Sequence, residues 1–219
     1  MSQSATDMQQ LEEILSDPVK RLNTLYKILI KGDGDEDGLV VQFKMNRAQR
    51  RFVERLHSRN IILKARQLGF TTLVCLVWLD HALFNNNVRC GIIAQDREAA
   101  EVIFRDKVKF AYDNLPPELK EQFPLAKDSA SELLFAHNNS SIRVATSMRS
   151  GTIHRLHISE FGKICAKFPQ KAAEVMTGSI PAVPKTGIII VESTAEGQEG
   201  EFYDMTQRSM ALHDLKREL

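Results

Sequence analysis

The stretch that decides the fold is residues 61–72, IILKARQLGFTT, which opens with an apolar run and closes with a glycine, a phenylalanine and two threonines. The apolar run is typical of a buried strand, and the residues after it lead into the almost wholly apolar segment 70–84. A strand, a loop and a buried helix form the layout of a phosphate-binding loop. Backbone N–H groups at the start of such a helix face an anion, and a threonine hydroxyl can hold Mg²⁺.

This loop departs from the usual pattern GxxxxGK[ST] at two positions. Gly69 and Thr71 fit the pattern. Lys64 stands where the first glycine is usual, and Phe70 stands where the lysine is usual. The phosphates still need cations, which either Lys64 or Arg66 can supply from the start of the loop. Because Lys64 is a compact charge held at a strand end, we expect it to replace the usual lysine, with the planar fork of Arg66 on the γ-phosphate.

The remainder of the chain alternates apolar strands with amphipathic helices, a pattern that predicts an α/β fold with a mostly parallel central sheet flanked by helices. The run GIIIVE (187–192) is typical of a strand covered on both faces. Residues 137–140 form a hairpin turn between two short strands. Further strands are predicted at 90–95, 133–136, 141–146 and 154–159. Helices are predicted at 7–30 (one or two), 46–58, 70–84, 96–114, 166–177 and 200–219. Asp17 and Pro18 are a suitable N-cap and first residue for the second helix within 7–30.

Composition excludes several classes of protein. With 43% apolar and 26% charged residues, the 219-residue chain can build a core, so a disordered, collagen-like or coiled-coil chain is excluded. The net charge of +1 means that nucleic acid would be bound through a local patch or a partner. Three scattered cysteines argue against disulfides and a zinc site, and indicate a reducing compartment. Neither a secretion signal nor a membrane span of about 20 apolar residues is found.

An acidic residue follows the strand at 154–159, as a phosphate-loop ATPase requires. Glu160 projects from the carboxyl end of that strand, where open α/β sheets bind their ligands. The usual pair at this point is Asp-Glu, but Ser159 stands in the first place, and it can hold a metal-bound water without adding charge. A third strand ends in Glu192-Ser193-Thr194, where small hydroxyl residues suit a γ-phosphate sensor.

Three segments, KARQLGFTT (64–72), LHISEFGKI (156–164) and ESTAEGQEGEFY (192–203), resemble the ATPase domain of the large terminase subunit of tailed bacteriophages. The resemblance extends from about Phe43 to Tyr203. Members of this family commonly carry the lysine at the start of the loop and Ser-Glu in the acidic motif. The resemblance implies a P-loop NTPase of the ASCE, RecA-like type that uses ATP and Mg²⁺.

The resemblance also implies roles for single residues. Gln49 would read the adenine edge, since an amide offers both a donor and an acceptor. Arg149 would act as an arginine finger across a subunit interface, Glu160 would orient the attacking water, and Ser193 and Thr194 would couple hydrolysis to movement. The implied ATP-binding residues are Gln49, Lys64, Arg66, Gln67, Gly69, Phe70, Thr71 and Thr72. The implied Mg²⁺ residues are Thr71, Ser159 and Glu160, partly through water.

For the protein as a whole, the resemblance implies an ATP-hydrolysing motor that drives double-stranded DNA into a procapsid. Its partners would be DNA, the portal protein, the small terminase subunit and further copies in a ring, without a membrane. It would work in the host cytoplasm, transiently at the portal. We expect an N-terminal helical segment and acidic loop (1–42), an ATPase core (43–199) and a linker helix (200–219). Large terminases also carry a nuclease domain, which this chain does not include.

Two other functions remain open from the residues alone: a helicase-like nucleic-acid-dependent ATPase, and an inactive nucleotide-fold module that serves interactions. A calcium loop at 33–38 is disfavoured because the twelfth position holds Lys44 in place of the bidentate glutamate. His154 and His157 fall on opposite faces of a strand, so we expect packing or turn roles. A basic group on the helix at 46–58 could contact DNA phosphates, and it consists of Arg47, Arg50, Arg51 and Arg55.

Overall fold

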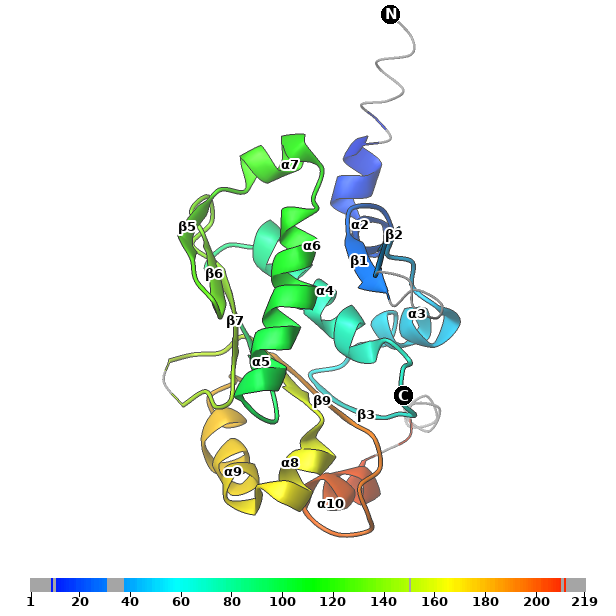
Figure 1. The fold of residues 1–219 in the computed structure, drawn as a ribbon, viewed down its shortest axis with the longest axis vertical. Coiled ribbons are helices and arrows are strands. Elements are labelled where there is room, and N and C mark those ends of the chain that lie inside the picture. The colour runs from blue at the N-terminus through cyan, green and yellow to red at the C-terminus, as the bar shows by residue number, and fades with distance from the viewer. Residues whose placement is uncertain (1–8, 10, 31–37, 150, 210, 212–219) are drawn as a thin grey trace, which may run out of the picture.

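The computed structural model describes residues 9, 11–30, 38–149, 151–209 and 211, and their central element is a seven-stranded sheet (Figure 1). Its strands in chain order are β3 (Arg59–Leu63), β4 (Arg89–Ile93), β5 (Leu125–Asp128), β6 (Glu132–Phe135), β7 (Ser141–Ala145), β8 (Arg155–Ser159) and β9 (Ile188–Ser193). In space they run β3-β9-β8-β4-β7-β6-β5. The strands from β3 to β7 pair in parallel, and β6 and β5 extend the sheet antiparallel. The predicted mostly parallel sheet is confirmed, and β5 is a strand that the sequence pattern did not indicate.

Helices cover both faces of the sheet (Figure 1). One face carries α4 (Phe70–Phe84) and a continuous run of α5 (Arg97–Ile103), the π-helical turn η1 (Phe104–Lys109) and α6 (Phe110–Asp113). The other carries α8 (Phe161–Lys167), α9 (Pro169–Glu174), the π-helical turn η2 (Val175–Ser179) and α10 (Glu201–Arg208). Because side chains alternate along a strand, Ile92 belongs to the first core and its neighbour Ile93 to the second. Both predicted core faces of the parallel strands are therefore filled.

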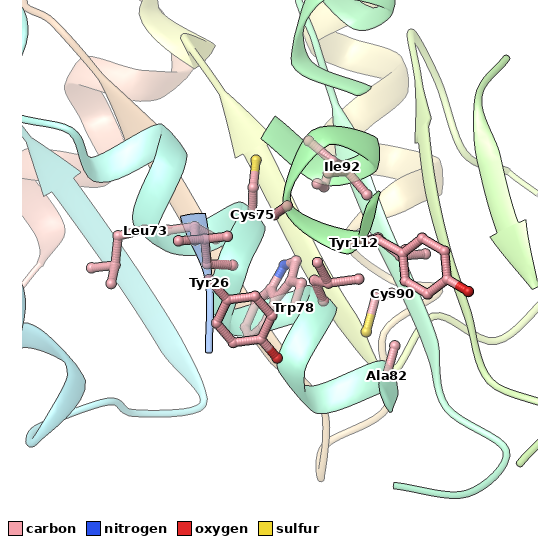
Figure 2. Packing of buried hydrophobic residues seen from close by; sticks show 14 of the residues in the cluster. Tyr26, Leu73, Cys75, Trp78, Ala82, Cys90, Ile92 and Tyr112 are labelled. Atoms are coloured by element: carbon pink, nitrogen blue, oxygen red, sulfur yellow. The ribbon is translucent and has the colours of Figure 1, made fainter. Parts of the chain in front are cut away.

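The helix α4 is buried on nearly every side, as its apolar sequence predicts (Figure 2). Trp78 at its centre is 1% exposed and packs within the first core. A helix held this firmly fixes the position of its own N-terminus, which is the end that follows the predicted phosphate loop. The core packing therefore holds the loop at one end.

The N-terminal part of the chain differs from the prediction of one or two helices over 7–30. The helix α2 (Pro18–Thr24) starts as predicted, with the Asp17 side chain accepting hydrogen bonds from two backbone N–H groups of its first turn. Residues 27–30 form instead β1 (Lys27–Ile30), which pairs antiparallel with β2 (Leu39–Gln42). The partner strand β2 is separated from β1 along the chain by residues 31–37. Only the pairing of the two segments in the fold therefore determines that 27–30 is a strand. The acidic segment 33–38, for which the sequence disfavours calcium binding, falls largely on those residues, outside the described part of the chain.

Two other predicted helices are interrupted. The helix predicted at 166–177 is divided between α8 and α9 at Phe168, whose backbone leaves the helical region because proline follows it. The helix predicted at 96–114 is present as α5, η1 and α6, after which Pro117 begins a further short helix, α7 (Pro117–Gln122). The shorter α3 (Arg47–Val53) stands within the helix predicted at 46–58.

The three cysteines are free thiols. No helix among the described residues has the length and apolar character that a bilayer span requires.

Candidate nucleotide site

The loop between β3 and α4, for which the sequence predicts phosphate binding, has left-handed backbone at two residues. Gly69, the residue before α4, has a φ of +69°, and Gln67 has a φ of +62°. Left-handed backbone is rare for a residue such as glutamine and concentrates at ligand sites. The N–H of Lys64 donates to the Ser193 carbonyl (3.1 Å), which fixes the start of the loop against the end of β9. The loop is therefore held at both ends, with the N-terminus of a 15-residue helix behind it.

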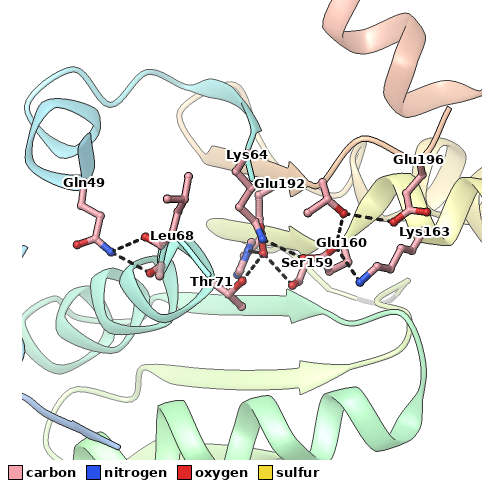
Figure 3. Close-up of polar contacts among 12 residues, drawn as sticks. Gln49, Lys64, Leu68, Thr71, Ser159, Glu160, Lys163, Glu192 and Glu196 are labelled. Atoms are coloured by element: carbon pink, nitrogen blue, oxygen red, sulfur yellow. Dashed lines mark hydrogen bonds and ion pairs between the residues drawn. The ribbon is translucent and has the colours of Figure 1, made fainter. Parts of the chain in front are cut away.

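Gln49 on α3 ties this loop to the rest of the fold (Figure 3). Its amide nitrogen donates to the carbonyls of Leu68 (3.3 Å) and Gly69 (3.0 Å). Its amide oxygen accepts from the backbone N–H of Asn46 (2.9 Å) in the cap of α3. Both ends of the amide are thus engaged by the protein, so the predicted reading of an adenine edge would require these bonds to be exchanged.

The structure separates the roles of the other loop residues. Phe70 is buried and packs edge-to-face on Phe52, so its side chain belongs to the core and only its backbone N–H can serve a nucleotide. Thr72 accepts a hydrogen bond from Lys107 of η1 (3.2 Å), a cation that sequence patterns did not place here. Arg66 is exposed, and within the described residues it forms no ion pair.

Lys64 lies between two carboxylates rather than over the loop. Its ammonium is 2.9 Å from Glu160 Oε1 and 3.0 Å from Glu192 Oε2. Burial alone would lower the pKa of this ammonium, but the charges of Glu192 and Glu160 raise the pKa above its usual value. Lys64 therefore stays charged, and its single positive charge is shared between the two carboxylates.

Glu160 stands at the carboxyl end of β8, as predicted, in a left-handed conformation with a φ of +54°. A second lysine, Lys163, lies 3.2 Å from its Oε2. Burial would raise the pKa of this carboxyl group, but the hydrogen bond and charge of Lys64 bring it below the usual value. The carboxylate is consequently ionised at neutral pH and partly exposed, so it can accept a hydrogen bond from a water molecule.

Glu192 is the main residue that the sequence interpretation missed. It is fully buried, and its Oε1 accepts hydrogen bonds from the hydroxyls of Thr71 (2.7 Å) and Ser159 (2.8 Å). His157 Nε2 lies 3.3 Å from the same Oε1, so this histidine is a third polar contact of Glu192. It therefore belongs to the site and is not a simple packing residue. Burial would raise the pKa of Glu192, but the hydrogen bond of His157 and the charges of His157 and Lys64 lower it to about 2. Glu192 is thus the charged centre on which the predicted metal residues Thr71 and Ser159 converge.

Strand order explains why Glu192 lies here. The strand β9 is inserted between β3, which leads into the loop, and β8, which carries Ser159 and Glu160. In this register Glu192 is level with Ile62 on one side and Ser159 on the other. The rule that placed Glu160, an acid at the carboxyl end of a parallel strand, applies equally to Glu192 and could have identified it.

The two predicted coupling residues follow Glu192. Thr194 links the acids of the site, since its hydroxyl lies 3.4 Å from Glu160 Oε2 and 3.2 Å from Glu196 Oε1. The Ser193 hydroxyl is buried and has no hydrogen-bond partner in the described structure. It faces Gly162 of α8, where an added Cβ would lie 2.8 Å from it. Both residues therefore connect the end of β9 to the acidic segment.

Arg149 is the one predicted catalytic residue that the structure does not bring to this cluster. Its exposed guanidinium pairs with Glu174 of α9. In the described part of the chain, no hydrogen bond or ion pair joins it to Lys64, Glu160 or Glu192.

Comparison with solved structures bears on this fold. The structure aligns with the large terminase of bacteriophage HK97 at a TM-score of 0.62 and 17% identity, over 85% of this chain and 39% of that one. The fold is similar to that of phage large terminases. A mutant of the large terminase ATPase domain of Thermus phage P74-26 aligns at a TM-score of 0.54 and 18% identity, over 77% of this chain and 72% of that one. No protein-family model and no curated protein matches the chain. The predicted α/β fold is confirmed.

The geometry of the loop predicts that Gly69→Ala destabilises the protein. A left-handed backbone costs a non-glycine residue about 1–2 kcal/mol, and the new Cβ would lie 2.9 Å from Gln49 Nε2. Urea unfolding measures the loss. Gly151→Ala is the matched control, because Gly151 also has a positive φ (+86°) but no atom within 4 Å of the added Cβ. Equal losses of unfolding free energy in the two variants would show that the close contact with Gln49 adds nothing to the destabilisation.

Proposed function

We propose that this chain is an ATP-hydrolysing motor domain that moves double-stranded DNA into a viral procapsid. One observation supports this most: the phosphate loop, the ammonium of Lys64 and the acids Glu160 and Glu192 converge from three adjacent parallel strands. Parallel strands place their carboxyl ends at one edge, where α/β proteins bind nucleotides. The likeness to large terminase structures supports DNA packaging as the use of this chemistry.

In this proposal the residues divide the work of phosphoryl transfer. Backbone N–H groups from Gln67 to Thr72 cradle the phosphates, and Lys64 and Arg66 supply the positive charge. Thr71, Ser159 and the acids beside them would hold Mg²⁺, which when bound neutralises charge on the phosphate oxygens. Glu160 accepts the proton of the attacking water, since its ionised carboxylate is partly open to solvent. Thr194, whose hydroxyl contacts Glu160, couples changes at that carboxylate during hydrolysis to movement of the segment after β9.

The wider role follows the same proposal. Residues 43–199 form the ATPase core and 1–42 precede it, while α10, at the start of the proposed linker 200–219, packs on the core through Phe202. The chain works in the host cytoplasm and at the procapsid portal, with the portal protein, the small terminase subunit and further copies in a ring as partners. The exposed arginines of α3 are the proposed contacts to DNA phosphates, and they are Arg47, Arg50 and Arg51.

The test is ATP turnover of the purified chain as a function of protein concentration, with and without DNA. Because Arg149 pairs with Glu174 and, among the described residues, not with the acids of the site, we expect turnover per chain to rise with concentration and Arg149→Ala to remove that rise. An arginine finger is worth about 10³–10⁵-fold in rate, so the effect is large.

Glu174→Gln is the matched control for Arg149→Ala. It removes the partner of Arg149 within the chain but leaves the guanidinium in place. If Arg149 acts on a neighbouring subunit, Glu174→Gln keeps the concentration dependence. Equal losses in both variants would indicate that the ion pair has only a structural role. A brisk rate that does not depend on concentration would contradict the finger, and the absence of turnover under all conditions would favour an inactive module.

A further inference from the structure

The acidic motif of this chain lacks one carboxylate. The residue before Glu160 is Ser159, whose hydroxyl carries no charge, although a Mg²⁺ ion beside the phosphate loop is normally held by the loop hydroxyl and an aspartate on the acidic strand. A hydroxyl alone is a poor ligand for a divalent cation, which prefers carboxylate oxygens. The charge that the motif lacks must come from another element if the chain holds Mg²⁺ there.

Glu192 occupies the place where that charge is needed. Its Oε1 is 2.8 Å from the Ser159 hydroxyl and 2.7 Å from the hydroxyl of Thr71 in the loop (Figure 3). Its carboxylate is therefore within hydrogen-bond reach of the residue that replaces the aspartate and of the hydroxyl that would bind the same ion. Both distances follow from the insertion of β9 between β3 and β8.

The surroundings of Glu192 point to a cation at this position. The carboxylate is fully buried, a state that costs several kcal/mol unless positive charge offsets it. Among the described residues, the group paired with its Oε2 is the ammonium of Lys64, at 3.0 Å. That ammonium is also the charge that the phosphates of a nucleotide would attract. If Lys64 turns to a phosphate, Glu192 needs another cation.

We infer that Glu192 is the carboxylate that holds Mg²⁺ beside the phosphate loop, in place of the aspartate that the acidic motif lacks at Ser159. In the nucleotide-free protein Lys64 neutralises it, and with nucleotide the metal ion takes over that task. His157, whose Nε2 lies 3.3 Å from Glu192 Oε1, is then a positioning residue for this carboxylate. This inference rests on the proposed function, because it assumes that the loop binds a nucleotide.

The experiment measures metal binding and not turnover. A fluorescent ADP analogue is titrated into the full chain with excess Mg²⁺ and with EDTA, and binding of Mn²⁺ in the presence of ADP is followed by electron paramagnetic resonance. We expect Glu192→Gln to bind ADP in EDTA about as well as the parent. Its affinity for Mn²⁺ should fall by about 10- to 100-fold, in the range found when support for a metal ligand is removed.

Two further variants make the result specific. Glu199→Gln changes an exposed glutamate in the loop that follows β9 and should leave Mn²⁺ affinity unchanged. The double variant Ser159→Asp with Glu192→Gln moves the carboxylate back to the acidic strand, at a position 2.8 Å away across the hydrogen bond. We expect it to recover most of the Mn²⁺ affinity. Should the single variant fail to fold, this double variant carries the test, because it keeps the number of carboxylates.

The outcomes separate this inference from the proposed function. A Glu192→Gln variant with parental Mn²⁺ affinity overturns the inference and leaves the proposed function standing. A folded double variant without Mn²⁺ affinity also overturns it. A parent chain that binds no ADP in either buffer overturns the inference and the proposed function together.

Discussion

Glu160→Gln is expected to remove ATP hydrolysis while ADP and ATP bind within a few-fold of the parent. The amide keeps the size of the side chain and can still accept a hydrogen bond from Lys64, whose ammonium lies 2.9 Å from Glu160 Oε1. It cannot take a proton from water. A general base of this kind contributes about 10²–10⁴-fold to a rate, so single-turnover hydrolysis should fall by that factor.

The pH profile provides an independent check on Glu160. In the nucleotide-free chain the neighbouring Lys64 holds the pKa of this carboxyl below its ordinary value of 4.5, so kcat/KM, which reports the groups of the free enzyme, should hold as the pH falls to 4.5 and drop only below it. Glu196→Gln is the matched control, since Glu196 contacts the same Thr194 hydroxyl from the other side. It should hydrolyse ATP normally. If instead Glu160→Gln retains near-parental turnover, the base lies elsewhere, and Glu192, which shares the Lys64 ammonium with Glu160, is the next candidate.

Lys64→Ala is expected to have the second large effect: it should lower both the free energy of unfolding and the affinity for nucleotide. Removing the ammonium leaves Glu192 buried and Glu160 half-buried without their shared cation. Breaking a buried ion pair from one side costs about 3–5 kcal/mol, so chemical unfolding should show a loss of that size. Charged hydrogen bonds are worth about 1.5–3 kcal/mol each, so ADP affinity in EDTA should drop by about 10- to 100-fold.

A double variant separates these two effects of Lys64. In Lys64→Met with Glu192→Gln, the cation and the fully buried acid are removed together, so we expect stability to recover. Nucleotide affinity should not recover, because no charge returns to the loop. Arg66→Ala gives the comparison: Arg66 is exposed and unpaired within the described residues, so its loss should leave stability unchanged. If the double variant bound ADP with the affinity of the parent, Lys64 would not be the phosphate contact, and Arg66 would be assigned that role.

The local sequence was sufficient to predict much of the fold. The apolar segment 70–84 has no polar face, so it could only be a buried helix, and α4 has those bounds. The pattern of strand, glycine and threonine predicted the loop because left-handed backbone at Gly69 needs a residue without Cβ. Asp17-Pro18 predicted the start of α2 through side-chain capping. Each of these signals depends on residues that are neighbours along the chain.

The tertiary structure alone decided the features that depend on which strands are neighbours. The segment 27–30 is a strand because it pairs with 39–42, and local propensity does not reveal that partner. Glu192 enters the site because β9 lies between β3 and β8, an order that the alternation of strands and helices leaves open. Lys64 faces Glu160 and Glu192 for the same reason. The sequence by itself determined the chemical groups and the elements that carry them, whereas strand order and register decided which groups meet, because hydrogen bonds between parallel strands join residues far apart in the chain.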